Sequence, residues 1–496
     1  MDWNAHLAAL QVIVPMFTVP LVVLLRPSGL AWAAAMTASI GAFAVSIALT
    51  LGVLDGQVYG YSLGSWPAPY GIELRVDAFS AIVLLMVTGT SSLALLAARA
   101  TLDAEIESHR QPLFYSAWLL VLTGLTGILV SADAFNFFVF MEIAALASYV
   151  LVAGGKDRRA LPAAFTYLVM GTIGATFYLV GVGLIYMMTG TLNLADMESR
   201  IHVVADQTPI MVAAGFITVG LALKAAVFPL HAWLPNTYTY APHAVTVFLA
   251  ACSTKVVLYL LLRFDFFVFQ ANIVSHDIQF SWFFLPLAVL ALLIGSGIAL
   301  FEKNLKRMLA YSSVAQVGYI LIGAGLVNVA GLTASVLTMF NHALAKGALF
   351  LAVACLAMRC TGLTHSDIKG AARDMPWTMA AFVVAGLSLI GMPGTAGFVS
   401  KWYLLSAVLE QGLLGISLAI IIVLSSLMSV IYIWRVVEAA YFHAPIPGTA
   451  TRGEAPPLLL AATWTAVLAN VYFGLNSALP VALSSAAAKT LLGHVP

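Results

Sequence analysis

The chain has 496 residues, of which 62% are hydrophobic and only 9% are charged. Soluble domains usually carry about 25% charged residues, so this composition excludes a water-soluble fold. The net charge of +1 leaves no basic surplus for binding nucleic acid. The three cysteines form no Cys-x-x-Cys motif, which argues against an iron–sulfur cluster, a thiolate zinc site and a disulfide framework. We therefore expect an all-α polytopic membrane protein with no cofactor and no metal centre of its own.

Apolar runs of spanning length follow one another along the whole chain. At roughly 20 apolar residues per crossing, the sequence has room for about fourteen spans. Each span is predicted to be a helix, because backbone polar groups in lipid need partners within the same segment. The first run is too long for a cleaved signal peptide and is predicted to stay as the first span. The predicted spans start near Ala8, Leu30, Phe79, Leu113, Ala134, Pro162, Ile210, Pro242, Trp282, Met308, Leu332, Thr378, Leu413 and Pro457.

The basic residues predict the orientation, since Lys and Arg collect in cytoplasmic loops. With the N-terminus outside and an even number of spans, the outer side holds only Arg75, Arg200, Arg263 and Lys489. We therefore expect a multi-pass protein of the bacterial inner (plasma) membrane with both termini outside the cytoplasm. The predicted inner loops hold Arg26, Arg99, Arg110, Lys156, Arg158, Arg159, Lys303, Lys306, Arg307, Arg359, Lys369, Arg373, Arg435 and Arg452.

Four lysines and one glutamate lie near the centres of predicted spans: Lys224, Lys255, Lys346, Lys401 and Glu142. A charge at mid-membrane costs roughly 2.5–3.5 kcal/mol. A structural ion pair would explain one lysine, but one glutamate can neutralise only one of the four. Desolvation favours the neutral form of a lysine and a nearby carboxylate favours the charged form, so such lysines can exchange protons near neutral pH. The set predicts a proton relay.

Three histidines fall between these lysines in the sequence. His342 and Lys346 are i, i+4 neighbours, so they share one helix face about 6 Å apart. His243 begins the eighth predicted span, and Lys255 follows roughly 18 Å further along the helix axis. His231 lies in a proline-rich segment. An isolated histidine is more often a packing or capping residue, but histidine both accepts and donates protons near pH 7, which favours a relay role for all three.

Two predicted spans are interrupted, one at Pro229 and the other at Pro393 and Gly394. The interrupted segments resemble each other: Gly220-Leu-Ala-Leu precedes the first break and Gly386-Leu-Ser-Leu precedes the second. They lie five spans apart, so the two copies are expected to run in opposite directions. Paired broken helices in inverted repeats are typical of ion-translocating proteins.

Several sequence stretches resemble a known family. The chain is similar to the antiporter-like subunits shared by respiratory complex I, membrane-bound hydrogenases and Mrp-type cation/proton antiporters, and most similar to the Mrp D subunits. One departure is Ser131-Ala-Asp133, where Thr-Gly-Asp is more frequent in the family. The stretches are Ser131-Ala-Asp133-Ala-Phe-Asn-Phe-Phe-Val-Phe-Met-Glu142, Arg159-Ala-Leu, Tyr167-Leu-Val-Met-Gly171 and Tyr186-Met-Met-Thr-Gly190-Thr-Leu-Asn193.

The resemblance implies fourteen transmembrane helices with two inverted five-helix repeats, spans 4–8 and 9–13. The expected division is residues 1–112 for helices 1–3, 113–266 for the first repeat, 267–441 for the second, and 442–496 for helix 14 and the C-terminal tail.

It further implies a proton-translocation set of Glu142, Lys224, Lys255 and Lys401, in which Glu142 and Lys224 pair. His231, His243, His342 and Lys346 are the expected relay residues.

The function implied is a proton-translocating subunit of a multi-subunit Na⁺(K⁺)/H⁺ antiporter, driven by the proton-motive force. Expected partners are the Mrp-type subunits A, B, C, E, F and G, the lipid bilayer, protons and monovalent cations. The same charges would suit a pumping subunit of complex I or of a hydrogenase, and this alternative stays open. A metal-dependent membrane enzyme is disfavoured because the sequence has no His-Glu-x-x-His motif. A passive scaffold would not need four buried lysines.

Overall fold

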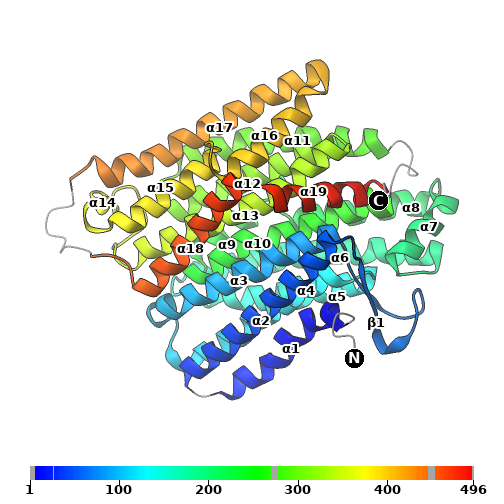
Figure 1. Ribbon diagram of the computed structural model, residues 1–496, viewed down its shortest axis with the longest axis horizontal. Helices are drawn as coiled ribbons and strands as arrows, with labels where there is room; N and C mark the ends of the chain where they lie inside the picture. The colour runs from blue at the N-terminus through cyan, green and yellow to red at the C-terminus, as the bar shows by residue number, and fades with distance from the viewer. Residues whose placement is uncertain (1–5, 26, 270–275, 445–452, 494–496) are drawn as a thin grey trace.

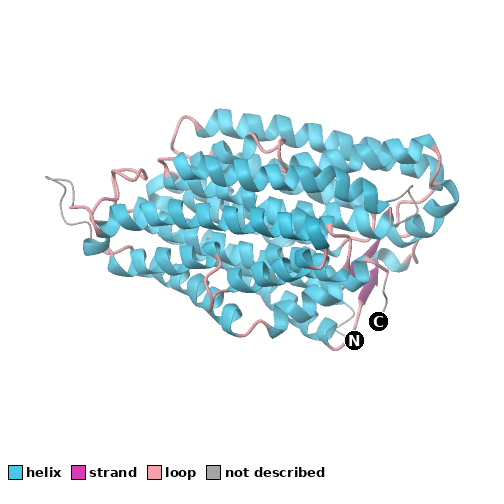
Figure 2. Ribbon diagram, turned by 90° about the horizontal axis from the view of Figure 1, so that it is seen from above, coloured by secondary structure: helices cyan, strands magenta, loops and turns pink. Residues whose placement is uncertain are grey.

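The computed structural model describes residues 6–25, 27–269, 276–444 and 453–493, except for the side chains of residues 276–280. It is a bundle of helices that run side by side along the long axis of the molecule (Figure 1). A two-stranded antiparallel hairpin, β1 (Tyr59–Ser62) and β2 (Glu73–Val76), lies at one end of the bundle (Figure 2). The helix α1 begins and α19 ends toward this same end.

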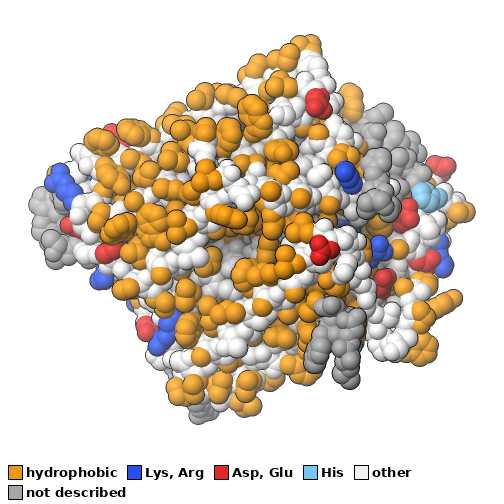
Figure 3. All heavy atoms as spheres, in the orientation of Figure 1, with side chains coloured by type: hydrophobic (Ala, Val, Ile, Leu, Met, Phe, Trp, Pro, Cys, Tyr) orange, Lys and Arg blue, Asp and Glu red, His pale blue; other side chains and the backbone are white. Residues whose placement is uncertain are grey.

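Among the described residues, twelve helices are long and apolar enough to cross a membrane. This confirms a polytopic helical membrane protein, while the count of fourteen spans remains a prediction. On the face seen in Figure 3, apolar side chains cover the middle of the bundle, and most charged side chains lie toward its two ends. The twelve are α1 (Leu7–Leu24), α2 (Ser28–Leu54), α3 (Ala78–Glu105), α4 (Gln111–Val130), α5 (Ala134–Ala153), α6 (Ala160–Thr189), α10 (His243–Leu262), α11 (His276–Phe301), α12 (Leu305–Gly325), α13 (Val329–Ala357), α17 (Gly412–Tyr441) and α18 (Pro457–Leu475).

The remaining helices are shorter, and two pairs of them flank a break in the chain. They are α7 (Leu194–Val204), α8 (Thr208–Lys224), α9 (Trp233–Tyr240), α14 (Ala371–Asp374), α15 (Pro376–Ile390), α16 (Ala396–Leu409) and α19 (Ala478–Leu491). The first break separates α8 from α9 and contains Pro229. The second separates α15 from α16 and contains Pro393 and Gly394.

Polar residues fix the first turns of several helices. The side chains of Asp77, Asp133, Asn193, Asn304 and Asn328 each accept a hydrogen bond from a backbone N–H two or three residues further on. Such caps satisfy backbone donors that have no partner within the helix. Each of these five helices therefore begins at a residue that the sequence specifies.

Three helices form the interior of the bundle. The apolar windows of α10, α12 and α13 are 94% buried, whereas that of α17 is only 28% buried. A helix that exposes most of its apolar surface in a membrane protein faces lipid or a partner subunit. Lys255 and Lys346 lie on two interior helices, α10 and α13, so the protein itself must stabilise their amino groups.

Two of the described basic residues that hydropathy placed in loops are buried in helical segments. Arg263 is buried in the helical segment η4 (Arg263–Val268), where it donates to both carboxylate oxygens of Asp77 at 2.6 and 2.9 Å. Lys306 is buried in the first turn of α12. Both predictions were wrong for one reason: a partner elsewhere in the chain stabilises the buried charge, so the helix extends past it. The predicted inner-loop residues Arg26 and Arg452 lie outside the described residues.

The Arg263–Asp77 pair joins α10 to the start of α3. Burial alone would raise the pKa of Asp77, but the charge and hydrogen bonds of Arg263 and the Ser80 N–H outweigh it and hold that pKa below its usual value. A lowered pKa means that the pair stabilises the fold at neutral pH and that this contribution is lost as the pH falls through the folded-state pKa.

We expect Arg263→Met to lower the free energy of unfolding by about 3–5 kcal/mol, because it leaves a buried carboxylate without its cation. Thermal unfolding of the purified protein in detergent measures the change. The control is Arg200→Met, which removes a 2.9 Å pair with Asp196 from an arginine side chain that is 48% exposed. Exposed pairs contribute about 0–1 kcal/mol. Equal melting temperatures for the two variants would contradict the prediction.

Candidate functional site: a buried axis of lysines

Glu142 and Lys224 form an ion pair inside the bundle. Lys224 Nζ donates to Glu142 Oε1 at 2.8 Å, and the side chains of Lys224 and Glu142 are 6% and 23% exposed, in that order. Lys224 is the last residue of α8, immediately before the break, where the carbonyl end of a helix favours a positive charge. The pairing implied by the family resemblance is therefore present in the geometry.

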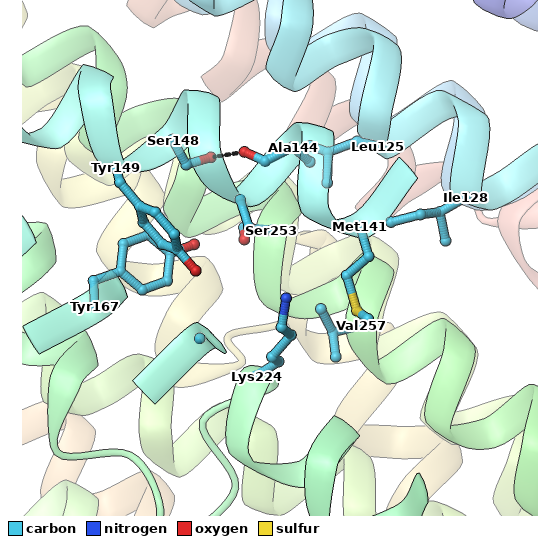
Figure 4. A pocket seen from close by; sticks show the side chains of 12 residues that line it. Leu125, Ile128, Met141, Ala144, Ser148, Tyr149, Tyr167, Lys224, Ser253 and Val257 are labelled. Carbon is cyan, nitrogen blue, oxygen red and sulfur yellow. Dashed lines mark hydrogen bonds between the residues drawn. The ribbon is translucent and has the colours of Figure 1, made fainter. Parts of the chain in front are cut away.

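A small cavity adjoins the pair, between α4, α5, α6, α8 and α10. Its volume is about 30 Å³, which is room for about two water molecules. The amino group of Lys224 points toward Ser253 across this space, and the hydroxyls of Tyr149 and Tyr167 lie close together at its edge (Figure 4). The cavity thus places polar groups between the ion pair and α10, the helix that carries Lys255.

Lys255 is completely buried two residues beyond Ser253. Its Nζ donates to the carbonyl oxygen of Ala250 in the same helix. Among the described residues, no carboxylate forms a salt bridge with Lys255. A lysine held by a carbonyl alone is stabilised much less in its charged form than one with a carboxylate partner.

We call Lys224, Lys255, Lys346 and Lys401 the axis of lysines. On α13 it contains Lys346, with His342 one turn before it. Lys346 Nζ donates to the carbonyl oxygen of Leu309 at 2.7 Å and to the hydroxyl of Ser312, both on α12. His342 is 4% exposed and lies in electrostatic reach of both Lys255 and Lys346. Neither of its ring nitrogens has a hydrogen-bond partner among the described residues. An imidazole between two lysines with both nitrogens free is suited to accept a proton on one and donate from the other.

A second cavity, of about 10 Å³, connects His342 to Lys401. This is room for about one water molecule, and Gln316 and Tyr319 also line it. Lys401 Nζ donates to the Ile390 carbonyl at 2.7 Å, the Leu389 carbonyl at 3.1 Å and the Ser426 hydroxyl at 2.9 Å.

The Leu389 and Ile390 carbonyls belong to the last turn of α15 and are free to accept because the helix stops there. Gly391, the first residue after α15, has φ of +94°, and a Cβ at this position would lie 2.7 Å from Cδ of Lys401. Glycine is therefore required both for the turn and for the close approach of the lysine.

Neither of the other two predicted relay histidines lines the two cavities. His231 lies in the first break, half-buried, with its ring stacked on that of Phe228 at 5.2 Å between centroids, and its Nδ1 has no hydrogen-bond partner in the described part of the chain. His243 lies at the first residue of α10, where its backbone N–H donates to the carboxylate of Glu105. Twelve residues of helix, roughly 18 Å, separate it from Lys255. The structure does not bring His243 next to the central lysines.

Several polar residues that line the axis could not be singled out from the sequence. Ser253, Tyr149, Tyr167, Gln316 and Tyr319 border the two cavities. Each is an ordinary packing residue within an apolar run, and only its position relative to other helices distinguishes it. The sequence offers a signal for Ser253 alone, which lies two residues before Lys255. Among the described residues, no three His, Cys, Asp or Glu side chains are grouped so as to hold a metal ion.

Several known proteins are similar to this chain in sequence and in fold. The chain is 41% identical over 463 residues to the N subunit of the NADH-quinone oxidoreductase of Desulforudis audaxviator, covering 92% of this chain and 90% of that protein. It is 32% identical to the D subunit of the Na(+)/H(+) antiporter of Alkalihalophilus pseudofirmus, covering 80% of this chain and 79% of that protein. A chain of the Mrp complex from Dietzia sp. superposes with a TM-score of 0.91 at 26% identity, covering 99% of this chain and 98% of the other.

A chain of the archaeal membrane-bound sulfane sulfur reductase superposes with a TM-score of 0.89 at 28% identity, covering 100% of this chain and 99% of the other. Residues 131–429, which contain Glu142 and all four lysines of the axis, match the family described as NADH:quinone oxidoreductase/Mrp antiporter, transmembrane. The chain belongs to this family of antiporter-like membrane subunits.

Proposed function

We propose that this chain is the proton-translocating subunit of a multi-subunit Na⁺(K⁺)/H⁺ antiporter, driven by the proton-motive force. The observation that carries the proposal is the buried Glu142–Lys224 pair, which opens through a small cavity toward lysines that have no carboxylate partner among the described residues. A row of near-equivalent proton sites is what a transmembrane relay requires, because no single step then crosses apolar protein.

In the proposed relay, a proton passes from the Lys224 ammonium through water in the first cavity to Lys255. His342 takes it up on one ring nitrogen and releases it from the other, and Lys346 lies one helical turn away on the same face. The second cavity leads from His342 to Lys401. Glu142 favours the protonated form of Lys224, so separating the two side chains releases the proton. The chain itself would transport ions rather than catalyse a chemical reaction.

The proposed architecture is fourteen transmembrane helices in two inverted repeats. It counts α8 with α9 as helix 7 and α15 with α16 as helix 12, and it keeps residues 113–266 and 267–441 as the repeats. Residues 1–112 and 442–496 flank them as helices 1–3 and as helix 14 with the tail. The presence of one break in each proposed repeat, with a buried lysine on one side of it, supports this division.

The proposed assembly contains the Mrp-type subunits A, B, C, E, F and G in the plasma membrane, with both termini outside the cytoplasm. The TM-score of 0.91 to a chain of an Mrp complex supports this assembly. A second candidate is the proton-pumping subunit of a redox complex such as complex I or a hydrogenase, which the 41% identity to an N subunit of NADH-quinone oxidoreductase favours. In both, the relay residues have the same roles.

The experiment that tests the proposal uses everted vesicles containing the whole native complex and an internal pH-sensitive dye. We expect addition of Na⁺ or K⁺ to dissipate an imposed pH gradient, with the rate dependent on this subunit. Proton pumping driven by a reduced electron donor, with no response to either cation, would replace the antiporter proposal with the redox alternative.

Glu142→Gln is expected to reduce cation-dependent proton exchange to near background, because it removes the carboxylate that keeps Lys224 charged. Lys224→Ala should be inactive as well. Lys224→Arg should also fail, since arginine stays charged and cannot release a proton. The control is Glu198→Gln on α7, which removes a carboxylate paired with His202 away from the axis. Near-normal exchange by an assembled Glu142→Gln complex would show that the ion pair has no role in transport.

Lys401→Ala is expected to abolish exchange, because the transmembrane field cannot replace a missing proton site. One charge moved through the potential gains only about 2.3 kcal/mol per 100 mV. Lys401→Glu should retain measurable exchange with a shifted pH optimum, since a carboxylate still carries a proton. Lys489→Ala, at an exposed lysine of α19, is the control. Full exchange by Lys401→Ala would mean that protons leave the axis before the second break.

A further inference from the structure

A second group of buried ionisable residues lies outside the axis of lysines. It consists of Glu105, His243 and Lys306, which we call the Glu105 cluster, at the point where α3 ends and α10 and α12 begin. The Glu105 carboxylate accepts from the His243 backbone N–H at 3.1 and 3.2 Å, and its Oε1 lies 3.8 Å from His243 Nε2. Lys306 Nζ donates to the Ala241 carbonyl at 2.7 Å and lies in electrostatic reach of Glu105.

One side of the Glu105 cluster is partly accessible to solvent, and the other side is buried. The Glu105 and His243 side chains are 15% and 17% exposed, whereas Lys306 is 3% exposed. Lys156, in the basic loop between α5 and α6, is also in electrostatic reach of Glu105. Because basic loops face the cytoplasm, the accessible side of the cluster is the cytoplasmic one.

The buried member of the cluster is close to the axis along α12. Lys306 precedes Leu309 by three residues, which is about 4.5 Å of helix. The Leu309 carbonyl accepts from Lys346, and Ser312, one turn further, binds the same amino group. One helix therefore carries polar groups from the cytoplasmic end to the centre of the bundle.

The charges around the cluster include several cations for one carboxylate. Glu105 faces Lys306 and Lys156, and His243 faces Lys306. The nearby acid Asp103 is engaged elsewhere, by Gln111 at 2.8 Å and Arg99 at 3.9 Å. A single closed salt bridge would explain Glu105 with Lys306. It would not explain an imidazole that lies 3.8 Å from that carboxylate and is about as exposed as it is.

We infer that the Glu105 cluster is the site at which protons pass between the cytoplasm and the axis, with Glu105 and His243 exchanging protons with water and Lys306 connecting them to Lys346. This inference rests on the proposed function of proton translocation. It also gives His243 a role at the end of the relay instead of between the lysines.

The test uses everted vesicles with the whole complex, in which the cytoplasmic face meets the bath. We compare Glu105→Gln with Asp103→Asn, a carboxylate two residues earlier that is 66% exposed. Loss of a positioned proton-transfer group should slow cation-dependent proton exchange by roughly ten-fold or more. The dependence of the rate on bath pH should shift, while its dependence on luminal pH should stay as in the wild type. Asp103→Asn should change neither.

Two further variants separate proton exchange from structural support. Glu105→Asp keeps a titratable group and should recover part of the rate. His243→Gln keeps the backbone N–H bonded to Glu105 but removes the ring, and should shift the bath-pH profile in the same direction as Glu105→Gln. Complex assembly is followed by immunoblot of the purified complex.

Wild-type rates in assembled Glu105→Gln, or a loss that is uniform at every bath pH, would overturn the inference and leave the cluster a structural clamp. If Glu142→Gln is inactive while Glu105→Gln is normal, only this inference fails. If both variants exchange normally, the proposed function itself fails.

Discussion

The cost of burying charge in a low-dielectric interior governs this structure. A carboxylate or an ammonium inside a membrane protein is tolerated only where hydrogen bonds or an opposite charge replace its hydration. Asp77 supplies the opposite charge for Arg263, and Glu142 supplies it for Lys224. Lys401 has no carboxylate partner among the described residues and is held by the carbonyl oxygens of Leu389 and Ile390. The helix break beside Lys401 is therefore part of its binding site, since an unbroken helix would use those carbonyls internally.

The lysines beside the two helix breaks are stabilised in different ways. At the first break the lysine ends the helix and has a carboxylate partner, whereas at the second it lies after the break and reaches back to the end of the preceding helix. In the first arrangement a carboxylate at 2.8 Å offsets the burial of the Lys224 ammonium. In the second arrangement, carbonyl dipoles and the Ser426 hydroxyl bind Lys401, and they stabilise its charged form less than a carboxylate would. Two lysines whose charged forms are stabilised to different degrees suit a relay that must take up a proton at one place and release it at another.

Much of this could be predicted from the sequence. The helical class, the buried lysines and the two interruptions follow from hydropathy and from proline and glycine positions, because those signals are local. The Glu105 cluster and the Arg263–Asp77 pair could not be predicted, because their members are up to 201 residues apart and meet only through helix packing. Lys306 and Arg263 were assigned to loops, since hydropathy marks where an apolar run ends and does not register a helix that continues past a neutralised charge.

The sizes of the two cavities have a consequence for which ion can use the axis. They offer about 30 and about 10 Å³, so one accepts a pair of water molecules and the other a single one. An alkali-metal ion would have to shed its hydration shell to enter, and the lysines along the axis would repel it in their charged form. A proton has no such shell to lose, because it moves by exchange between existing bonds. In the proposed function, the small cavities and the buried lysines would therefore both select against metal cations, which would need a separate route through the membrane.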